Sequence, residues 1–312
     1  MGDLGPAELR LMQDLAQQVF ARSPELVNGD ATVGELAWVW GKGVDALRPY
    51  WRHRFWFADG RLAGWGWAHL PHRIPRGDGS FREVTSANLI WQTHPERPEL
   101  LDPILDWYDE VAGDVDRLLT LQIADAEARS RAAAHGYVFD PATGADDGSW
   151  IQFNVRHLAD VPDPVLPEGF RFRTAAELSV ADVVGAHRAA WPGSPLTEAA
   201  FERVRRTWPY RADLHVLVEA PDGTLAATAI VWLDEVTRTG EFEPVGTHRD
   251  FRRRGLGTAL QLHGMRLAKA AGADRMLVAC VGAPAHPAAR DMYLGVGFRE
   301  FTRDVPQIKV AG

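Results

Sequence analysis

The stretch that decides the fold reads Arg252-Arg253-Arg254-Gly255-Leu256-Gly257. A predicted strand ends just before it, and an amphipathic helix follows it as far as Gly272. Glycine lets the backbone turn sharply and approach a ligand closely, and the free N–H groups at a helix start point toward an anion. Taken alone, the loop predicts either an anion-binding turn or a tight turn with a solvated basic face. It fits neither the Rossmann nor the Walker pattern.

Alternating strand and helix patterns surround this loop in the second half of the chain. Strands are expected at 170–174, 214–219, 225–233, 241–247 and 275–281, with two short strands near 298–303 and 307–310. Helices are expected at 179–191, 198–208, 256–271 and 287–295. The strand before the loop is therefore the fourth strand of this half.

Two further motifs flank the loop. Val245-Gly246-Thr247 lies on the strand before it, and Tyr293 and Gly297-Phe298 lie on and just after the last helix. In this order the three motifs resemble the GNAT superfamily of acyl-CoA-dependent N-acetyltransferases. The resemblance implies an α/β (α+β) fold, in which a mixed, mostly antiparallel sheet is flanked by helices and strands 4 and 5 splay apart. It covers the second half well and the first half only in outline.

The resemblance also implies where an acyl-CoA binds. In this superfamily the pantetheine arm lies between the splayed strands, where it would pair with the backbone of Val245 and Thr247. Loop amides would then bind the pyrophosphate. His286 departs from the family, which often has asparagine there. The cofactor-binding residues implied are Val245, Gly246, Thr247, Arg252, Arg253, Arg254, Gly255, Leu256, Gly257, Thr258 and His286.

Three side chains are candidates for proton transfer. Tyr293 matches the family's tyrosine that often protonates the leaving thiolate, a role that suits a phenol with an ordinary pKa of about 10. Glu241 and Glu243 lie two residues apart on the fourth strand and share a face if that strand is regular. Either would take the proton of the attacking amine, directly or through a water. The alternatives are a core aromatic and an exposed pair of glutamates at a strand end.

The first half repeats the same order of elements more faintly, which predicts an ancient duplication. Thr93-His94 repeats Thr247-His248, and Gly136-Tyr137 repeats Gly297-Phe298. The segment at the place of the loop, residues 95–103, contains prolines and carboxylates, which remove N–H donors and repel a pyrophosphate. We therefore expect this half not to bind CoA.

Domain limits follow from a polar stretch that contains three prolines. We predict a degenerate GNAT-like domain without a cofactor loop at 1–159, a linker at 160–169 and a GNAT catalytic domain at 170–312. Tryptophans are frequent in the first half. Trp65 and Trp67 share a strand face there and either line an acceptor pocket or pack in the core.

Composition limits the partners. The formal net charge of −8 argues against nucleic-acid binding and is compatible with a cationic small molecule, although solubility would explain it equally well. Cys280 is the single cysteine, so we expect neither a disulfide nor a cysteine zinc site, and no metal. Neither a signal peptide nor an apolar run long enough for a membrane span is recognised, so we expect a cytoplasmic protein.

These observations favour an N-acetyltransferase that moves an acetyl group from acetyl-CoA to a primary amine of a small molecule or peptide by direct attack. Acidic residues near the fourth strand, Asp234 and Glu235, would attract an ammonium group. One alternative is a non-catalytic acyl-CoA sensor or interaction protein that kept only the binding loop. A second is an acetyltransferase similar to mycothiol synthase, which also has tandem halves with only the second intact.

Overall fold

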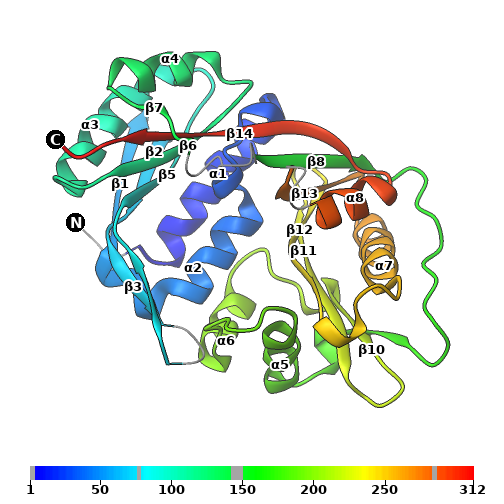
Figure 1. Cartoon of the computed structure of the whole chain (residues 1–312). Helices are drawn as coiled ribbons and strands as arrows, with labels where there is room; N and C mark the ends of the chain where they lie inside the picture. The colour runs from blue at the N-terminus through cyan, green and yellow to red at the C-terminus, as the bar shows by residue number, and fades with distance from the viewer. Residues whose placement is uncertain (1–3, 76–78, 142–149, 283–286) are drawn as a thin grey trace.

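The protein has two halves, each built from helices packed on strands (Figure 1). A computed structural model describes residues 4–75, 79–141, 150–282 and 287–312. The helices are α1 (Pro6–Arg22), α2 (Val33–Leu47), α3 (Leu101–Ala112), α4 (Ala126–Ala134), α5 (Val180–Ala190), α6 (Glu198–Arg206), α7 (Leu256–Ala270) and α8 (Pro287–Gly295). None of the described helices combines the length and apolarity that crossing a membrane requires.

Strands of both halves join into one large sheet. They are β1 (Trp51–Ala58), β2 (Arg61–His69), β5 (Ala87–Thr93), β6 (Arg117–Gln122), β7 (Val138–Phe139), β8 (Ile151–His157), β9 (Arg171–Thr174), β10 (His215–Glu219), β11 (Leu225–Asp234), β12 (Thr239–Thr247), β13 (Arg275–Val281) and β14 (Arg299–Lys309). Their order is β1-β2-β5-β6-β14-β8-β13-β12-β11-β10-β9, with β7 paired to β14. β3 (His72–Pro75) and β4 (Phe81–Val84), which the sequence did not predict, form a separate hairpin.

Among the described strands, each half contains one parallel pair in an otherwise antiparallel arrangement. The parallel pairs are β5–β6 in the first half and β12–β13 in the second. The expectation of two domains, each with a mixed and mostly antiparallel sheet flanked by helices, is therefore confirmed.

Local signals account for several helix starts. The side chain of Thr32 accepts a hydrogen bond from the Glu35 amide at the start of α2, and Ser179 and Asp182 form a reciprocal capping box at α5. Such caps satisfy amides that have no partner within the helix. α8 has the bounds expected from the sequence, and α5 lies within the helix expected at 179–191, which begins at its cap Ser179.

The last strand corrects one prediction. Instead of two short strands near 298–303 and 307–310, the chain forms the single strand β14, which pairs with β8 at its start and with β6 and β7 further on. Pro306 does not break the strand: its carbonyl oxygen accepts a hydrogen bond from the Asp140 amide at 3.0 Å. β14 therefore links the two halves through its backbone.

The halves also exchange strands. β8 precedes the predicted linker but pairs with β13 of the second half, while the end of β14 lies in the first half. Residues 158–170, which include the predicted linker, contain neither helix nor strand. The domain limits stay a prediction. The structure shows in addition that each half receives a strand from the other.

Trp65 and Trp67 have no exposed surface, and they pack in a core that joins α1, β2 and residues of the second half, such as Leu277. Their core-packing alternative is confirmed. The sheet thus supports a long interface between the halves, along which α2 of the first half faces α6 and β12 of the second (Figure 1).

Candidate functional site

The two strands at the centre of the second half separate after four residue pairs. β12 and β13 pair in parallel only from Thr239–Arg275 to Phe242–Val278. β12 then stays with β11, and β13 stays with β8. A bulge causes this change, because Glu243 and Pro244 together oppose the single residue Ile230 of β11. The predicted splay of strands 4 and 5 is confirmed.

Backbone groups of β12 line the edge of the resulting gap. The His248 amide donates to the Ala226 carbonyl of β11 at 2.9 Å. Because successive residues of a strand direct their N–H and C=O groups to opposite edges, those of Val245 and Thr247 point away from β11, toward the gap. This is the orientation that pairing with an extended ligand arm requires. Gly246 lies between them, and a Cβ there would come within 2.4 Å of the Trp191 ring.

The loop after β12 leads directly into α7. Gly255, at φ 78°, immediately precedes the helix, and Arg253 also has a positive φ of 65°. No side chain in the described part of the chain caps the first turn of α7, so its amides remain open to a ligand. Gly257 is needed for packing, since a Cβ there would lie 2.7 Å from Met292 Sδ of α8.

The three loop arginines are exposed and bind no carboxylate among the described residues. Arg252 donates to the Thr247 carbonyl oxygen at 3.3 Å, and the Arg254 guanidinium lies 5.2 Å from the centre of the Phe251 ring. Thr258 is exposed on the first turn of α7. The predicted loop residues therefore form one basic helix start with free amides, which fits a pyrophosphate. His286 lies outside the described residues.

Tyr293 lies on α8 and packs in the hydrophobic core of the second half. It is 6% exposed and makes an edge contact with Phe298, with ring centres 5.9 Å apart. Burial, followed by the charge of Glu243, raises the pKa of its phenol, so it keeps its proton near neutral pH. The charge of Glu243 thus acts on a phenol that belongs to the hydrophobic core of the second half, together with Phe242 and Phe298.

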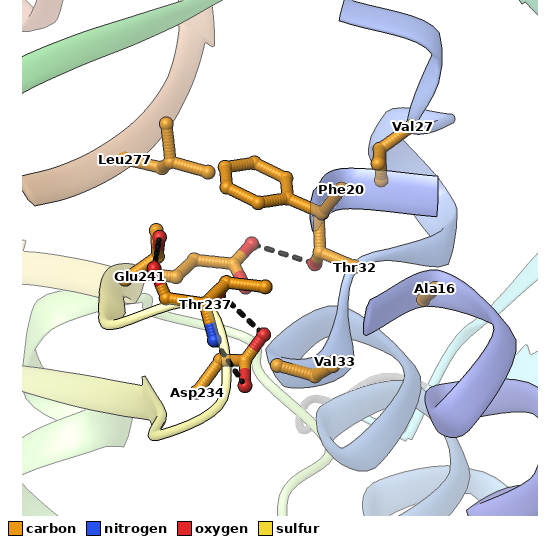
Figure 2. Close-up of a pocket in the computed structure, with 10 residues that line it drawn as sticks. Ala16, Phe20, Val27, Thr32, Val33, Asp234, Thr237, Glu241 and Leu277 are labelled. Atoms are coloured by element: carbon orange, nitrogen blue, oxygen red, sulfur yellow. Dashed lines mark hydrogen bonds between the residues drawn. The ribbon is translucent and has the colours of Figure 1, made fainter. Parts of the chain in front are cut away.

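The glutamates of β12 occupy different surroundings. Glu241 accepts a hydrogen bond from the Thr32 hydroxyl at 2.7 Å, next to the start of α2. Figure 2 shows it facing Thr32 and Phe20 of the first half, beside a small cavity of about 30 Å³, which is room for a water. Burial raises its pKa to about 8. Glu243 instead faces a much larger cleft.

Two charged residues of the first half belong to this site, and the sequence did not reveal them. Burial raises the pKa of both Glu35 and Glu243, and the charge of Glu243 raises that of Glu35 further. The positive charge of Lys42 acts in the opposite direction on both carboxyl groups. Thr32 and Glu35 have the spacing of a capping box, so the sequence gives Glu35 an ordinary structural role. Only the packing of α2 on β12 brings it to the site.

The large cleft lies between the halves and has a volume of about 640 Å³. α2, the segment between α5 and α6, and the bulge of β12 form its walls. Trp38, His187 and Trp191 are its aromatic residues, Lys42, Asp45 and Glu243 carry its charges, and most of the remaining lining is apolar. Neither Trp65 nor Trp67 reaches it.

Comparisons with known proteins agree with this geometry. Residues 181–298 match the model of the acetyltransferase (GNAT) family. A GCN5-related N-acetyltransferase from Sphaerobacter thermophilus is 19% identical, with a TM-score of 0.61 over 98% of this chain and 94% of that one. A tandem GNAT protein from the clavulanic acid biosynthesis pathway is 16% identical, with a TM-score of 0.61 over 97% and 95%.

A GNAT-family acetyltransferase from Colwellia psychrerythraea is 13% identical, with a TM-score of 0.56 over 97% of both chains. No curated protein matched the sequence. Residues 181–298 thus carry the pattern of the acetyltransferase (GNAT) family, and the fold of the whole chain is similar to that of these solved structures.

Proposed function

We propose that this protein transfers an acetyl group from acetyl-CoA to a primary amine by direct attack. The observation that carries the proposal is the combination of three features around one gap: the edge of β12 that borders it, the open start of α7, and the pair Glu243 and Tyr293, in which the carboxylate charge acts on the phenol. When bound, acetyl-CoA supplies an activated acyl thioester.

Each residue then has a defined task. The first-turn amides of α7 and the arginines of residues 252–254 hold the pyrophosphate, and Val245 and Thr247 align the pantetheine arm. Glu243 accepts a proton from the ammonium group, so that the amine nitrogen bonds to the acyl carbon while the carbon–sulfur bond breaks. Tyr293 donates its proton to the departing sulfur and is reprotonated by the second proton, which the newly acylated nitrogen loses. The products are the N-acetyl amine and CoA.

Between the two candidate bases, we assign proton removal to Glu243. Its carboxyl group lines the cleft in which an amine would lie, whereas Glu241 is hydrogen-bonded to Thr32 beside a cavity that holds no more than a small molecule such as water. We assign Glu241 a positioning role, in which it fixes the start of α2 against β12.

A thiol-release assay with acetyl-CoA and a panel of primary amines, together with calorimetry of acetyl-CoA, tests the proposal. We expect both CoA release and binding. The Tyr293→Phe variant should bind acetyl-CoA normally and lose about 10²–10⁴ in kcat. Binding without release on any amine would instead favour an acyl-CoA sensor. Full turnover by Tyr293→Phe would remove Tyr293 from the mechanism.

A further inference from the structure

The cleft at Glu243 has an aromatic wall that continues over three side chains. The ring of His187 lies 5.5 Å from that of Trp38 and 4.6 Å from that of Trp191, measured between centroids. Trp191 in turn lies over the backbone of Gly246, where a Cβ would come within 2.4 Å of its ring. The wall therefore ends at the residue of β12 that borders the gap, so a molecule lying along it would direct one end toward the proposed reaction centre.

The charges of the cleft are few. Burial and the neighbouring Lys42 and Arg188 lower the pKa of His187 to about 4, which leaves this ring neutral at pH 7. Asp45 is held in an ion pair by Arg203. Glu243 is thus the lining carboxylate that remains available to an ammonium group in the described part of the cleft.

Lys42 supplies the opposing charge. Its ammonium group lies 4.9 Å from the centre of the Trp38 ring and forms no ion pair with a described carboxylate. A ligand with a second positive charge would meet Lys42 and find no free carboxylate to compensate it. A ligand with many hydroxyl groups would lose hydrogen bonds to water against a mostly apolar lining.

We infer that the acceptor is a hydrophobic monoamine, an aryl- or long alkyl-amine whose apolar body lies along the wall formed by Trp38, His187 and Trp191, with its amino group at Glu243. This inference rests on the proposed function. The first half then has a definite role, because α2 supplies Trp38 and Lys42 and so contributes to the choice of acceptor. Diamines and amino sugars are disfavoured by the same wall.

Acceptor choice is tested with the full-length protein, by measuring CoA release with phenethylamine, tryptamine and octylamine against putrescine and glucosamine. We expect kcat/KM for the hydrophobic amines to exceed that for the other two by about tenfold or more. Equal or better use of putrescine or glucosamine would overturn the inference while leaving acetyl transfer intact.

Two variants locate the specificity. Trp191→Ala should raise KM for tryptamine by about tenfold, with the Kd of acetyl-CoA nearly unchanged, whereas the matched Trp56→Ala, on the far strand β1, should leave KM unchanged. Ala46→Glu adds a carboxylate at an exposed lining position of α2 and should raise kcat/KM for putrescine relative to that for tryptamine. If neither variant changes the ratio of kcat/KM for tryptamine to kcat/KM for putrescine, the cleft does not select the acceptor and the inference fails.

Calorimetry with the amines alone separates this inference from the proposed function. Tryptamine should bind wild-type protein more tightly than putrescine does, and Ala46→Glu should reduce that difference, whether or not acetyl-CoA is turned over. Absence of CoA release together with this binding pattern would contradict acetyl transfer only. Absence of any preference for tryptamine would contradict the hydrophobic acceptor only.

Discussion

The two halves have nearly the same backbone at their separated strands. In the first half, β5 and β6 pair in parallel only from Ala87–Arg117 to Leu89–Leu119. The His94 amide donates to the Ala63 carbonyl oxygen at 2.8 Å, as the His248 amide does to Ala226 at 2.9 Å. Each of these histidines also accepts, through Nδ1, from the amide two residues further on. The repeated Thr-His pair thus has the same structural role twice.

The side chains make the halves different. Aligning the two histidines places Trp91 at the position of Val245, and the Trp91 indole donates to the Thr120 carbonyl oxygen of β6 at 3.1 Å. The Asn28 side chain donates to the same oxygen at 2.8 Å. In the first half the gap is therefore bridged by the protein itself. We expected no cofactor there because of the prolines, and the structure supplies a stronger physical reason.

The proposed acid is also absent from the first half. Gly136 and Gly297 both have a positive φ after a helix, and the residue that follows each one donates its amide five residues back, to Ala132 and Tyr293 respectively. Ala132 therefore occupies the position of Tyr293. The comparison teaches that a few side chains, rather than the fold, distinguish an open gap from a closed one.

The largest effect, on acetyl-CoA affinity, should come from giving the second half the tryptophan that bridges the gap in the first half. In Val245→Trp, an indole at the position of Trp91 would fill the gap between β12 and β13, and we expect acetyl-CoA affinity to fall by about a hundredfold or more. Val245→Ile is the matched control and should retain binding. Unchanged affinity in the tryptophan variant, measured by calorimetry, would show that the cofactor does not use this gap.

The next effect sharpens the assignment of the base. Glu243→Gln should lower kcat by about 10²–10⁴ with little change in the Kd of acetyl-CoA, since a carboxamide cannot accept the proton of the amine. Glu241→Gln should lower kcat by clearly less than Glu243→Gln does, because its side chain retains a hydrogen-bond acceptor for Thr32. Steady-state kinetics of both variants measures this difference, and the opposite order would exchange the two roles.

A smaller effect concerns the pH profile. Burial raises the pKa of Glu243, and only the ionised carboxylate accepts a proton, so kcat/KM should rise with pH over the neutral range rather than near pH 4–5. Lys42 lowers this pKa, so Lys42→Met should move the rising limb to higher pH. Lys269→Met, on α7, is the control. A limb that moves to lower pH in Lys42→Met would contradict the assignment.

The smallest effect is on stability. Burial raises the pKa of Glu241 from 4.5 to about 8, so the folded protein holds this proton more tightly than the unfolded chain does. The stabilisation is complete below pH 4.5 and is lost as pH rises toward 8. The side chain of Glu241→Gln cannot ionise. Between pH 5 and 8, the free energy of unfolding of this variant should therefore fall by about 1–2 kcal/mol less than that of wild type, after allowance for partial exposure. Urea unfolding of both proteins at pH 5 and pH 8 measures this difference. An equal fall in the free energy of unfolding of the two proteins would refute the prediction.

Local patterns predicted much of the second half. Apolar spacing and the glycine loop lie within a few residues of the elements that they define, so the sequence revealed α5, α7, α8 and the order of the strands along this half. The splay followed from the family resemblance. The cofactor and catalytic residues other than His286 do gather around the separated strands, and their roles stay predictions.

Long-range contacts explain what the sequence did not reveal. Trp38, Lys42 and Glu35 lie far along the chain from β12, and only the packing of α2 against the second half brings them to the site. The exchange of β8 and β14 likewise depends on pairing between distant strands. In the sequence, Trp91 cannot be distinguished from any other core aromatic residue. Its role in bridging the gap between β5 and β6 becomes clear only when the strands of the two halves are aligned.

The stoichiometry of acetyl-CoA binding to the full-length protein tests the comparison most directly. Because the gap in the first half is bridged by Trp91 and that in the second is open, calorimetry should give one acetyl-CoA per chain, with that site lost in Val245→Trp. Two acetyl-CoA molecules per chain, or one that survives in Val245→Trp, would contradict the account.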